Sequence, residues 1–281
     1  HPSVADSFKE LEARGFEVVT LNADEKGYIN LEELKREVDE NTILVSIMYV
    51  NNEVGTVQPI EKIAEIIKSK NKNCIFHTDC VQAFGKHPIN GKHFDAISVS
   101  GHKIHCPKGV GVLYLRKGVR AKNLHFGGGQ EKGFRPGTEN TGSIVAMGLG
   151  AEIAKRDLEK NFEKVKAVKE KLMTICDILP DVYVNGDSEN GSPYILNLSF
   201  EGVKGEVLLH ALENYEIYVA TGSACSSRAK EKKKIVDYLI DGRGSSTVRF
   251  SFDCENTVEE AEKVIEVLKE QVPMLRMFQP R

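Results

Sequence analysis

Residues 42–79, TILVSIMYVNNEVGTVQPIEKIAEIIKSKNKNCIFHTD, contain the pattern that decides the fold. Residues 42–50 form a run rich in β-branched residues, residues 60–69 have apolar residues at helical spacing, and residues 74–79 are a second apolar run. Near-continuous apolar strands separated by helices are typical of a parallel sheet that is covered on both faces. These residues therefore predict a strand, a helix and a second strand of one sheet.

The same alternation extends to both sides of this stretch. On the N-terminal side, Val4, Phe8 and Leu11 predict an amphipathic helix, which is followed by a strand at 16–21 and a helix at 31–38. On the C-terminal side, two more strands are predicted at 96–100 and 109–115. The fold class is therefore α/β, with a large domain built on a mostly parallel sheet.

The pattern changes after residue 117. Glycines concentrate at 127–137 and predict a long ordered loop, and the helical stretch at 143–179 is expected to link two domains. We place the boundary near Ile153, between a large domain at 1–153 and a small α+β domain at 154–281. In the small domain we expect strands at 182–185, 194–200, 217–220 and 246–251 and helices at 205–212, 231–239 and 258–274.

Composition excludes several classes of protein. The 281 residues contain 38 Lys plus Arg against 41 Asp plus Glu, so the chain lacks the basic excess that a nucleic-acid binder needs. The apolar runs are far shorter than the ~18–20 residues that cross a bilayer, so no membrane partner is expected. With no signal peptide, the six cysteines are interpreted as reduced thiols of a cytoplasmic protein. A start at His1, directly before a helix, indicates a fragment.

Lys103 is the first candidate for chemistry. It lies in SVSGHKIHCPKG, residues 98–109, between two predicted strands and among small and hydroxyl-bearing residues. Such a lysine suits the Schiff-base role that lysine plays with pyridoxal phosphate, although most lysines are simply solvated. His102, His105 and Cys106 match no common zinc pattern, so no metal is expected.

Asp79 ends the predicted strand at 74–79, at the edge of an α/β sheet where ligands bind. A buried aspartate needs a cationic partner, and a protonated pyridine nitrogen supplies one. Gln82, one turn later, could reach the phenolic oxygen of such a cofactor. The alternative is that Asp79 caps the helix that follows.

Cys225 stands in VATGSACSS, residues 219–227, among small polar residues that do not form a core. A thiol on such a loop suits a nucleophile, and nearby Arg228 and Lys230 favour its thiolate. The alternative is an exposed but inert cysteine.

Arg249 is the single charged residue of the apolar strand TVRFS, residues 247–251. A buried arginine needs a carboxylate, which either a substrate or an internal salt bridge could provide. Asn51, Asn52 and Glu53 follow another strand and could add a polar contact, although Asn-Asn is equally typical of a turn.

Taken together, these segments resemble cysteine desulfurases of the NifS/IscS type, which are class V aminotransferase-like enzymes with the pyridoxal-phosphate fold type I. The resemblance is collinear along essentially the whole chain. It rests on HPSV at 1–4, VSIMYVNNEVG at 45–55, HTD at 77–79, SGHK at 100–103, GGGQE at 127–131, RPGT at 135–138, GSAC at 222–225 and VRFS at 248–251.

The resemblance implies a site for pyridoxal 5'-phosphate. Lys103 would bind the cofactor covalently, Asp79 would pair with its pyridine nitrogen, and His1 would stack on its ring and take part in catalysis. The other polar atoms of the cofactor would be contacted by Asn52 and Gln82 on the phenolic side, by Ser100 and His102 at the phosphate, and at the phosphate by Thr138 from the neighbouring subunit of a homodimer.

The resemblance also implies the reaction. Arg249, helped by Asn52, would bind the carboxylate of L-cysteine, and Cys225 would take the substrate sulfur as a persulfide with release of L-alanine. The sulfur would pass to an acceptor protein, such as an iron–sulfur scaffold or a tRNA-thiolation enzyme. A selenocysteine lyase, another class V enzyme or a truncated non-catalytic scaffold are the alternatives.

The sequence departs from the family pattern in three places. The family's N-terminal region, with its lid and its phosphate-binding turn, precedes the position of His1 and is not part of this sequence. Residues 229–243 are shorter and richer in lysine than the corresponding family segment, and Pro136 replaces a serine.

Overall fold

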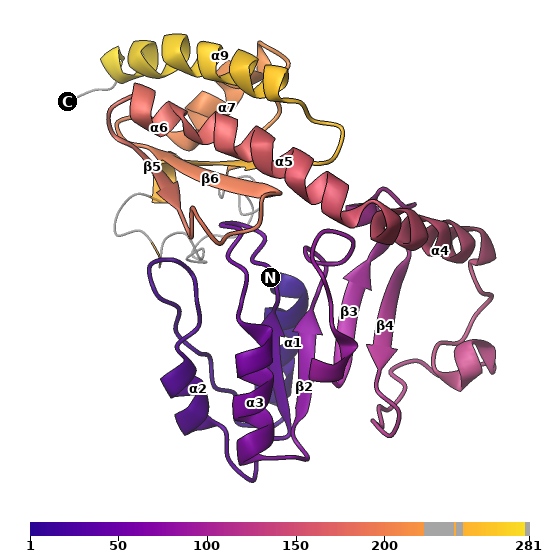
Figure 1. The fold of residues 1–281 in the computed structure, drawn as a ribbon. Coiled ribbons are helices and arrows are strands. Elements are labelled where there is room, and N and C mark those ends of the chain that lie inside the picture. The colour runs from indigo at the N-terminus through magenta and orange to yellow at the C-terminus, as the bar shows by residue number, and fades with distance from the viewer. Residues whose placement is uncertain (222–238, 240–243, 279–281) are drawn as a thin grey trace. The chain divides into compact units, whose positions relative to one another are not determined.

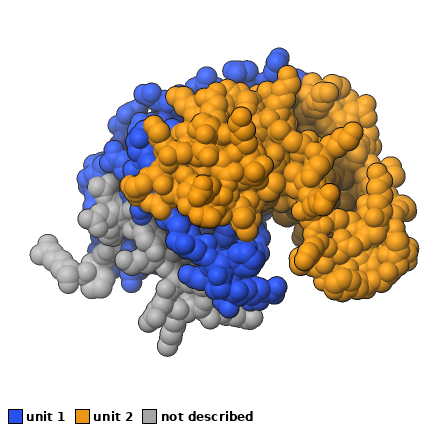
Figure 2. Space-filling model, turned by 90° about the horizontal axis from the view of Figure 1, so that it is seen from below, with its two compact units in different colours: residues 1–33, 50–58, 159–281 blue, residues 34–49, 59–158 orange. Residues whose placement is uncertain are grey.

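The computed structural model describes residues 1–221, 239 and 244–278. Its contacts group the chain into two compact units (Figure 2). One unit, here called the parallel-sheet unit, contains residues 34–49 and 59–158. The other, here called the antiparallel-sheet unit, contains residues 1–33 and 50–58 and the described part of 159–281.

The parallel-sheet unit is built on four strands in the order β1-β2-β3-β4 (Figure 1). β1 (Leu44–Met48), β2 (Ile75–Asp79) and β3 (Ala96–Ser100) are parallel, and β4 (Gly111–Leu115) pairs antiparallel with β3. The sheet is therefore mostly parallel, as the apolar runs predict.

Helices and short turns connect these strands. α3 (Ile60–Lys70) lies between β1 and β2 and buries an apolar stripe that includes Ile63 and Ile67. The helices that complete the unit are α2 (Leu31–Glu37, shared with the other unit), η1 (Gly91–His93), η2 (Gly101–Ile104), η3 (Gln130–Gly133) and α4 (Thr141–Arg156).

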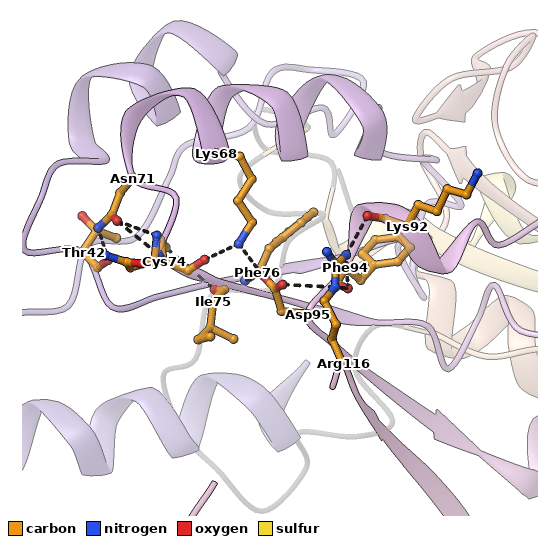
Figure 3. A network of polar contacts seen from close by, with 11 residues as sticks. Thr42, Lys68, Asn71, Cys74, Ile75, Phe76, Lys92, Phe94, Asp95 and Arg116 are labelled. Atoms are coloured by element: carbon orange, nitrogen blue, oxygen red, sulfur yellow. Dashed lines mark hydrogen bonds and ion pairs between the residues drawn. The ribbon is translucent and has the colours of Figure 1, made fainter. Parts of the chain in front are cut away.

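A buried carboxylate, Asp95, holds several of these elements together (Figure 3). Its Oδ2 accepts hydrogen bonds from Lys68 Nζ of α3 at 2.6 Å and from the backbone N–H of Phe76 in β2 at 2.9 Å. Its Oδ1 lies 3.4 Å from Nε of Arg116, which directly follows β4. Lys68 Nζ also donates to the carbonyl of Cys74 at 2.6 Å. Because both cations and a backbone donor converge on it, this buried charge is fully partnered.

The antiparallel-sheet unit contains a three-stranded sheet in the order β5-β6-β7. Its strands are β5 (Val182–Asn185), β6 (Ile195–Phe200) and β7 (Thr247–Ser251), and each neighbouring pair is antiparallel. The described helices of this unit are α1 (Pro2–Ala13), α5 (Leu158–Met173), α6 (Ile175–Ile178), α7 (Gly205–Glu213), η4 (Gly244–Ser246) and α9 (Val258–Met277).

The core of this unit lies between its sheet and its helices. Every residue of β6 is buried, and fully buried Leu172, Leu208 and Leu268 come from α5, α7 and α9. Thr257 begins α9 with a capping box, in which its side chain accepts from the Glu260 N–H and Glu260 accepts from the Thr257 N–H. The C-terminal pattern of strands and helices therefore forms an α+β layer.

Three sequence predictions are wrong in this structure. Residues 16–21 form no strand, because this segment pairs with no strand in the described part of the chain; nearby, Ala23 and Ile29 form an isolated bridge. Residues 217–220 contribute a single bridge, from Ala220 to Arg249, instead of a strand. The helical stretch at 143–179 is broken after Arg156 and again after Met173, so it forms α4, α5 and α6.

Two further predictions keep their status. The predicted helix at 231–239 falls almost entirely outside the described residues. The domain boundary near Ile153 stays a prediction. The parallel-sheet unit ends close to it, at Leu158, but residues 1–33 group with the antiparallel-sheet unit. No helix in the described ranges combines the length and apolar character required to cross a bilayer.

Replacing Asp95 tests the role of this carboxylate in stability. We expect D95N to lower the free energy of unfolding by about 2–4 kcal/mol, because Lys68 and Arg116 would lose their shared partner. Urea unfolding measures the change. The control is E266Q, which removes a surface ion pair with Lys269 and should change stability by about 0.5 kcal/mol or less. Equal effects of the two substitutions would contradict a structural role for Asp95.

Candidate functional site

The parallel strands of the first unit bring several predicted residues to one edge of the sheet. β2 ends at Asp79, which is in register with Ser98 of β3. β3 ends at Ser100 and runs directly into η2, which carries His102 and Lys103. Since the carboxyl ends of parallel strands meet at the same edge, Asp79 and the 100–103 turn share the position where α/β proteins bind ligands.

Asp79 is a buried carboxylate, with 5 % of its surface exposed. Its Oδ1 accepts one hydrogen bond, from the backbone N–H of Val81 at 2.9 Å. This bond is a local turn, because β2 is followed by turn residues and not by a helix that Asp79 could cap. Within the described residues Asp79 forms no ion pair, so this edge of the sheet holds a carboxylate that still needs a cation.

The turn after β3 places three polar side chains close together in sequence. Ser100 Oγ and His102 Nδ1 are hydrogen-bonded at 2.7 Å. Gly101 is required here, because a Cβ at that position would lie 2.9 Å from a methyl carbon of Val110. Lys103 is half-buried and makes no hydrogen bond or ion pair with the described part of the chain. Its amine is therefore available to a ligand.

The other predicted residues of this unit are less constrained. Gln82 is half-buried in the turn that follows β2, and Thr138 is exposed in the glycine-rich segment. In that segment Glu131 and Lys132 both adopt positive φ, at 50° and 58°, so its backbone is strained.

The second unit carries the remaining described candidates. Arg249 of β7 donates from Nη1 to the carbonyl of Asn52 at 2.9 Å and to Oε1 of Glu53 at 2.6 Å. The internal salt bridge considered for this arginine therefore exists, yet its Nε is buried and has no hydrogen-bond partner within the described residues. His1 is exposed at the start of α1, where its Nδ1 accepts from the Ser3 N–H at 3.2 Å.

The candidates thus form two groups. Asp79, Gln82, Ser100, His102, Lys103 and Thr138 belong to the parallel-sheet unit, whereas His1, Asn52 and Arg249 belong to the antiparallel-sheet unit. That both groups serve one site stays a prediction.

Cys225 lies outside the described residues. Among the described cysteines, burial raises the pKa of Cys74, of Cys254, of Cys176 to about 11 and of Cys80 to about 12. The thiolate, not the thiol, is the nucleophile, so these four are poor nucleophiles near neutral pH. Cys106 donates from Sγ to the carbonyls of Ile104 and Ala146, both at 3.6 Å.

Sequence reasoning missed His77, which lies two residues before Asp79 in β2. Hydrogen bonds join its Nδ1 to Ser46 Oγ of β1 at 2.7 Å and its Nε2 to Ser98 Oγ of β3 at 2.9 Å. Burial lowers the pKa of His77, and Asp79 partly opposes this shift. The alternation of side chains along a strand places residues 77 and 79 on one face, which could have found it.

Lys169 was missed as well, and no signal in the lysine-rich helix distinguishes it. It is 5 % exposed in α5 and donates from Nζ to the carbonyl of Ser192 at 3.0 Å. Burial lowers its pKa to about 8, while the carboxylate of Asp187 acts in the opposite direction. Asp187, with its own pKa lowered to about 2, accepts a hydrogen bond from Tyr28 Oη at 2.9 Å. Lys169 is therefore a buried lysine of lowered pKa whose amine is hydrogen-bonded to the backbone.

The pH dependence of stability tests this assignment. Lys169 has a pKa of about 8 in the folded chain against 10.5 for an ordinary lysine, so the unfolded chain binds more protons between these pH values. Stability of the protein relative to K169M should therefore rise by up to about 3 kcal/mol from pH 8 to 10.5. Chemical unfolding at several pH values measures it.

The matched control is K166M, which replaces an exposed lysine of the same helix. Its stability difference from the unchanged protein should be constant over this pH range. The same constant difference for K169M would contradict a lowered pKa.

Comparisons with known proteins place the chain among close relatives. The family model described as aminotransferase class V matches residues 1–264. A cysteine desulfurase of Nostoc sp. is 40 % identical over 287 residues, which cover 100 % of this chain and 71 % of that protein. The cysteine desulfurase IscS of Neisseria meningitidis is also 40 % identical, over 286 residues that cover 100 % of this chain and 70 % of that protein.

A solved structure shares the fold. The NifS-like protein superposes with a TM-score of 0.91 at 36 % sequence identity, and the match covers 98 % of this chain and 73 % of that one. The described structure is therefore similar to most of a NifS-like fold.

Proposed function

This chain belongs to the aminotransferase class V family, and on that premise we propose that it works as a pyridoxal-phosphate-dependent cysteine desulfurase. The net reaction converts L-cysteine and an enzyme thiol into L-alanine and an enzyme persulfide. The carbon–sulfur bond of the substrate breaks, a sulfur–sulfur bond forms on the enzyme, and the freed carbon takes up a proton.

The observation that carries the proposal is a buried carboxylate without a cation and a lysine without a polar partner, within the described residues, at one edge of the parallel sheet. Among the described residues Asp79 has no cationic partner and Lys103 has no polar partner; Asp79 ends β2 and Lys103 follows β3, at the same edge of the parallel sheet. A protonated pyridine ring whose aldehyde binds lysine satisfies both groups at once. These residues therefore fit pyridoxal phosphate.

When bound, pyridoxal phosphate supplies an electron sink that weakens the bonds of the amino acid's α-carbon. In our proposal Lys103 binds the cofactor and moves the substrate's α-proton, while Asp79 keeps the ring nitrogen protonated. Ser100 and His102, already joined at 2.7 Å, supply hydroxyl and imidazole groups for the phosphate. His1, Asn52, Gln82 and the Thr138 of a neighbouring subunit complete the cofactor site.

The substrate is held and attacked by the remaining candidates. Arg249 supports a carboxylate-binding role, because its Nε is a buried donor without a partner. Cys225 is assigned as the nucleophile that receives the sulfur. The raised pKa values of Cys74, Cys80 and Cys176 support this choice, since these thiols are poor nucleophiles.

We further propose that the protein acts as a cytoplasmic homodimer and passes the sulfur of Cys225 to an acceptor protein. An iron–sulfur scaffold or a tRNA-thiolation enzyme needs sulfur in this form. The names of the relatives from Nostoc and Neisseria support the first of these two steps, the removal of sulfur from cysteine.

The experiment uses the purified protein with added pyridoxal phosphate. We expect a visible absorption band that changes on addition of L-cysteine, together with release of alanine and, with a reductant, sulfide. K103A should lower turnover by about 100-fold or more, because it removes the proton-transferring amine. C225A should keep the band and its response but lose turnover.

Two substitutions serve as controls. K108A replaces an exposed lysine of the same segment, and C254A replaces a thiol whose pKa is raised. Both should retain colour and turnover. A protein that stays colourless with the cofactor and releases no alanine would contradict the proposal.

A further inference from the structure

The side chain of Glu53 binds Arg249, and the family assignment does not explain this contact. Glu53 Oε1 accepts from Arg249 Nη1 at 2.6 Å and from Asn52 Nδ2 at 2.8 Å. The two side chains are partly buried, with 22 % of the Arg249 side chain and 24 % of the Glu53 side chain exposed. One carboxylate oxygen therefore contacts both residues to which we assign substrate binding.

The carboxylate of Glu53 is itself fixed by its backbone. Asn51 Oδ1 accepts from the N–H groups of Glu53 at 2.8 Å and Val54 at 3.0 Å, which forms a tight turn. The Glu53 carbonyl accepts from Asn197 Nδ2 of β6 at 3.1 Å. Asn197 is the register partner of Arg249, so the turn and the arginine are held by the same pair of strands.

The turn cannot shift easily along β6. Gly55 adopts a φ of 75°, and a Cβ at this position would lie 3.1 Å from Cβ of Ile195 and 3.2 Å from its carbonyl oxygen. The backbone of 51–55 thus packs closely on the sheet. The Glu53 side chain therefore starts from a backbone that is held in place beside the guanidinium.

The contacts occupy only one part of the guanidinium. Both described hydrogen bonds leave from Nη1, while Nε is buried without a partner and Nη2 has none in the described part of the chain. A guanidinium binds a carboxylate through two parallel N–H donors, and Nε with Nη2 forms such a fork.

We propose that Glu53 is a positioning residue that anchors Nη1 of Arg249 and so presents Nε and Nη2 to the carboxylate of the amino-acid substrate. This inference rests on the proposed function, because it needs Arg249 to bind that carboxylate. It assigns to Glu53 no contact with the substrate. It predicts that the reach of the side chain matters more than its charge.

Two variants separate reach from charge. E53D keeps the negative charge but shortens the side chain by one methylene, so its oxygen no longer reaches Nη1. E53Q removes the charge but keeps an amide oxygen that can accept from Nη1 and Asn52. If Glu53 merely competed with the substrate for Arg249, E53Q would strengthen substrate binding and E53D would leave it unchanged or strengthen it.

The measurement is equilibrium binding of L-alanine to the full chain loaded with pyridoxal phosphate. Binding is detected by the change in visible absorbance. L-Alaninamide, which lacks the carboxylate, is the matched ligand. We expect E53D to raise the Kd of L-alanine about tenfold, the size of one lost charge-assisted hydrogen bond, with little change for L-alaninamide. E53Q should stay within about threefold of the unchanged protein for both ligands.

R249K distinguishes failure of this inference from failure of the proposed function. R249K should weaken the binding of L-alanine more than that of L-alaninamide, because lysine lacks the two-donor fork that binds a carboxylate. If R249K shows no selectivity for the carboxylate, or if no ligand changes the absorbance, the proposed function is contradicted and Glu53 loses its role with it. Two results would overturn only the positioning role of Glu53, provided that R249K weakens L-alanine binding selectively. In the first, E53D binds L-alanine normally. In the second, E53D weakens the binding of L-alanine and of L-alaninamide equally.

Discussion

A charged side chain that is removed from water needs a partner of opposite charge. In this protein that constraint distinguishes buried charges that stabilise the fold from those that we assign to a ligand site. Asp95 and Asp79 are equally buried aspartates of the parallel-sheet unit. Asp95 forms ion pairs with Lys68 and Arg116 and accepts a hydrogen bond from a backbone N–H. Its charge is therefore fully compensated by contacts that join α3 to the sheet. Asp79 receives one backbone N–H and no cation from the described residues, so its charge is left for a ligand.

The same constraint applies to the cationic side chains. Burial lowers the pKa of Lys169, but the residue is only 5 % exposed and its amine donates to a backbone carbonyl, as expected of a structural lysine. Lys103 is half-buried and has no polar partner among the described residues, which suits a group that binds a cofactor. Arg249 stands between these cases, since one nitrogen is anchored by Glu53 and another is buried and unpaired. The lysine whose pKa burial lowers, Lys169, is therefore not the lysine that we propose for the cofactor.

Short-range pattern predicted much of the fold, whereas the roles of the candidate site residues stay predictions. The apolar runs at 74–79 and 96–100 became β2 and β3, because strands buried on both faces need such runs. The 16–21 segment has the same local character but no neighbouring strand, so it stays unpaired. The Arg249–Glu53 contact joins residues 196 positions apart, and no local pattern encodes it. The family resemblance proposes Arg249 for substrate binding, but only the structure shows which of its nitrogens have no hydrogen-bond partner among the described residues.

The most direct measurement of the central claim is the identity of the lysine that carries the cofactor. Treatment of the pyridoxal-phosphate-loaded protein with sodium borohydride fixes the cofactor to its lysine, and peptide mass spectrometry locates the added mass. Because Lys103 has no polar partner and Asp79 no cation among the described residues, we expect a single modified residue, Lys103. Modification of Lys169 or of surface lysines instead, or of no lysine at all, would contradict the assignment of this sheet edge as the cofactor site.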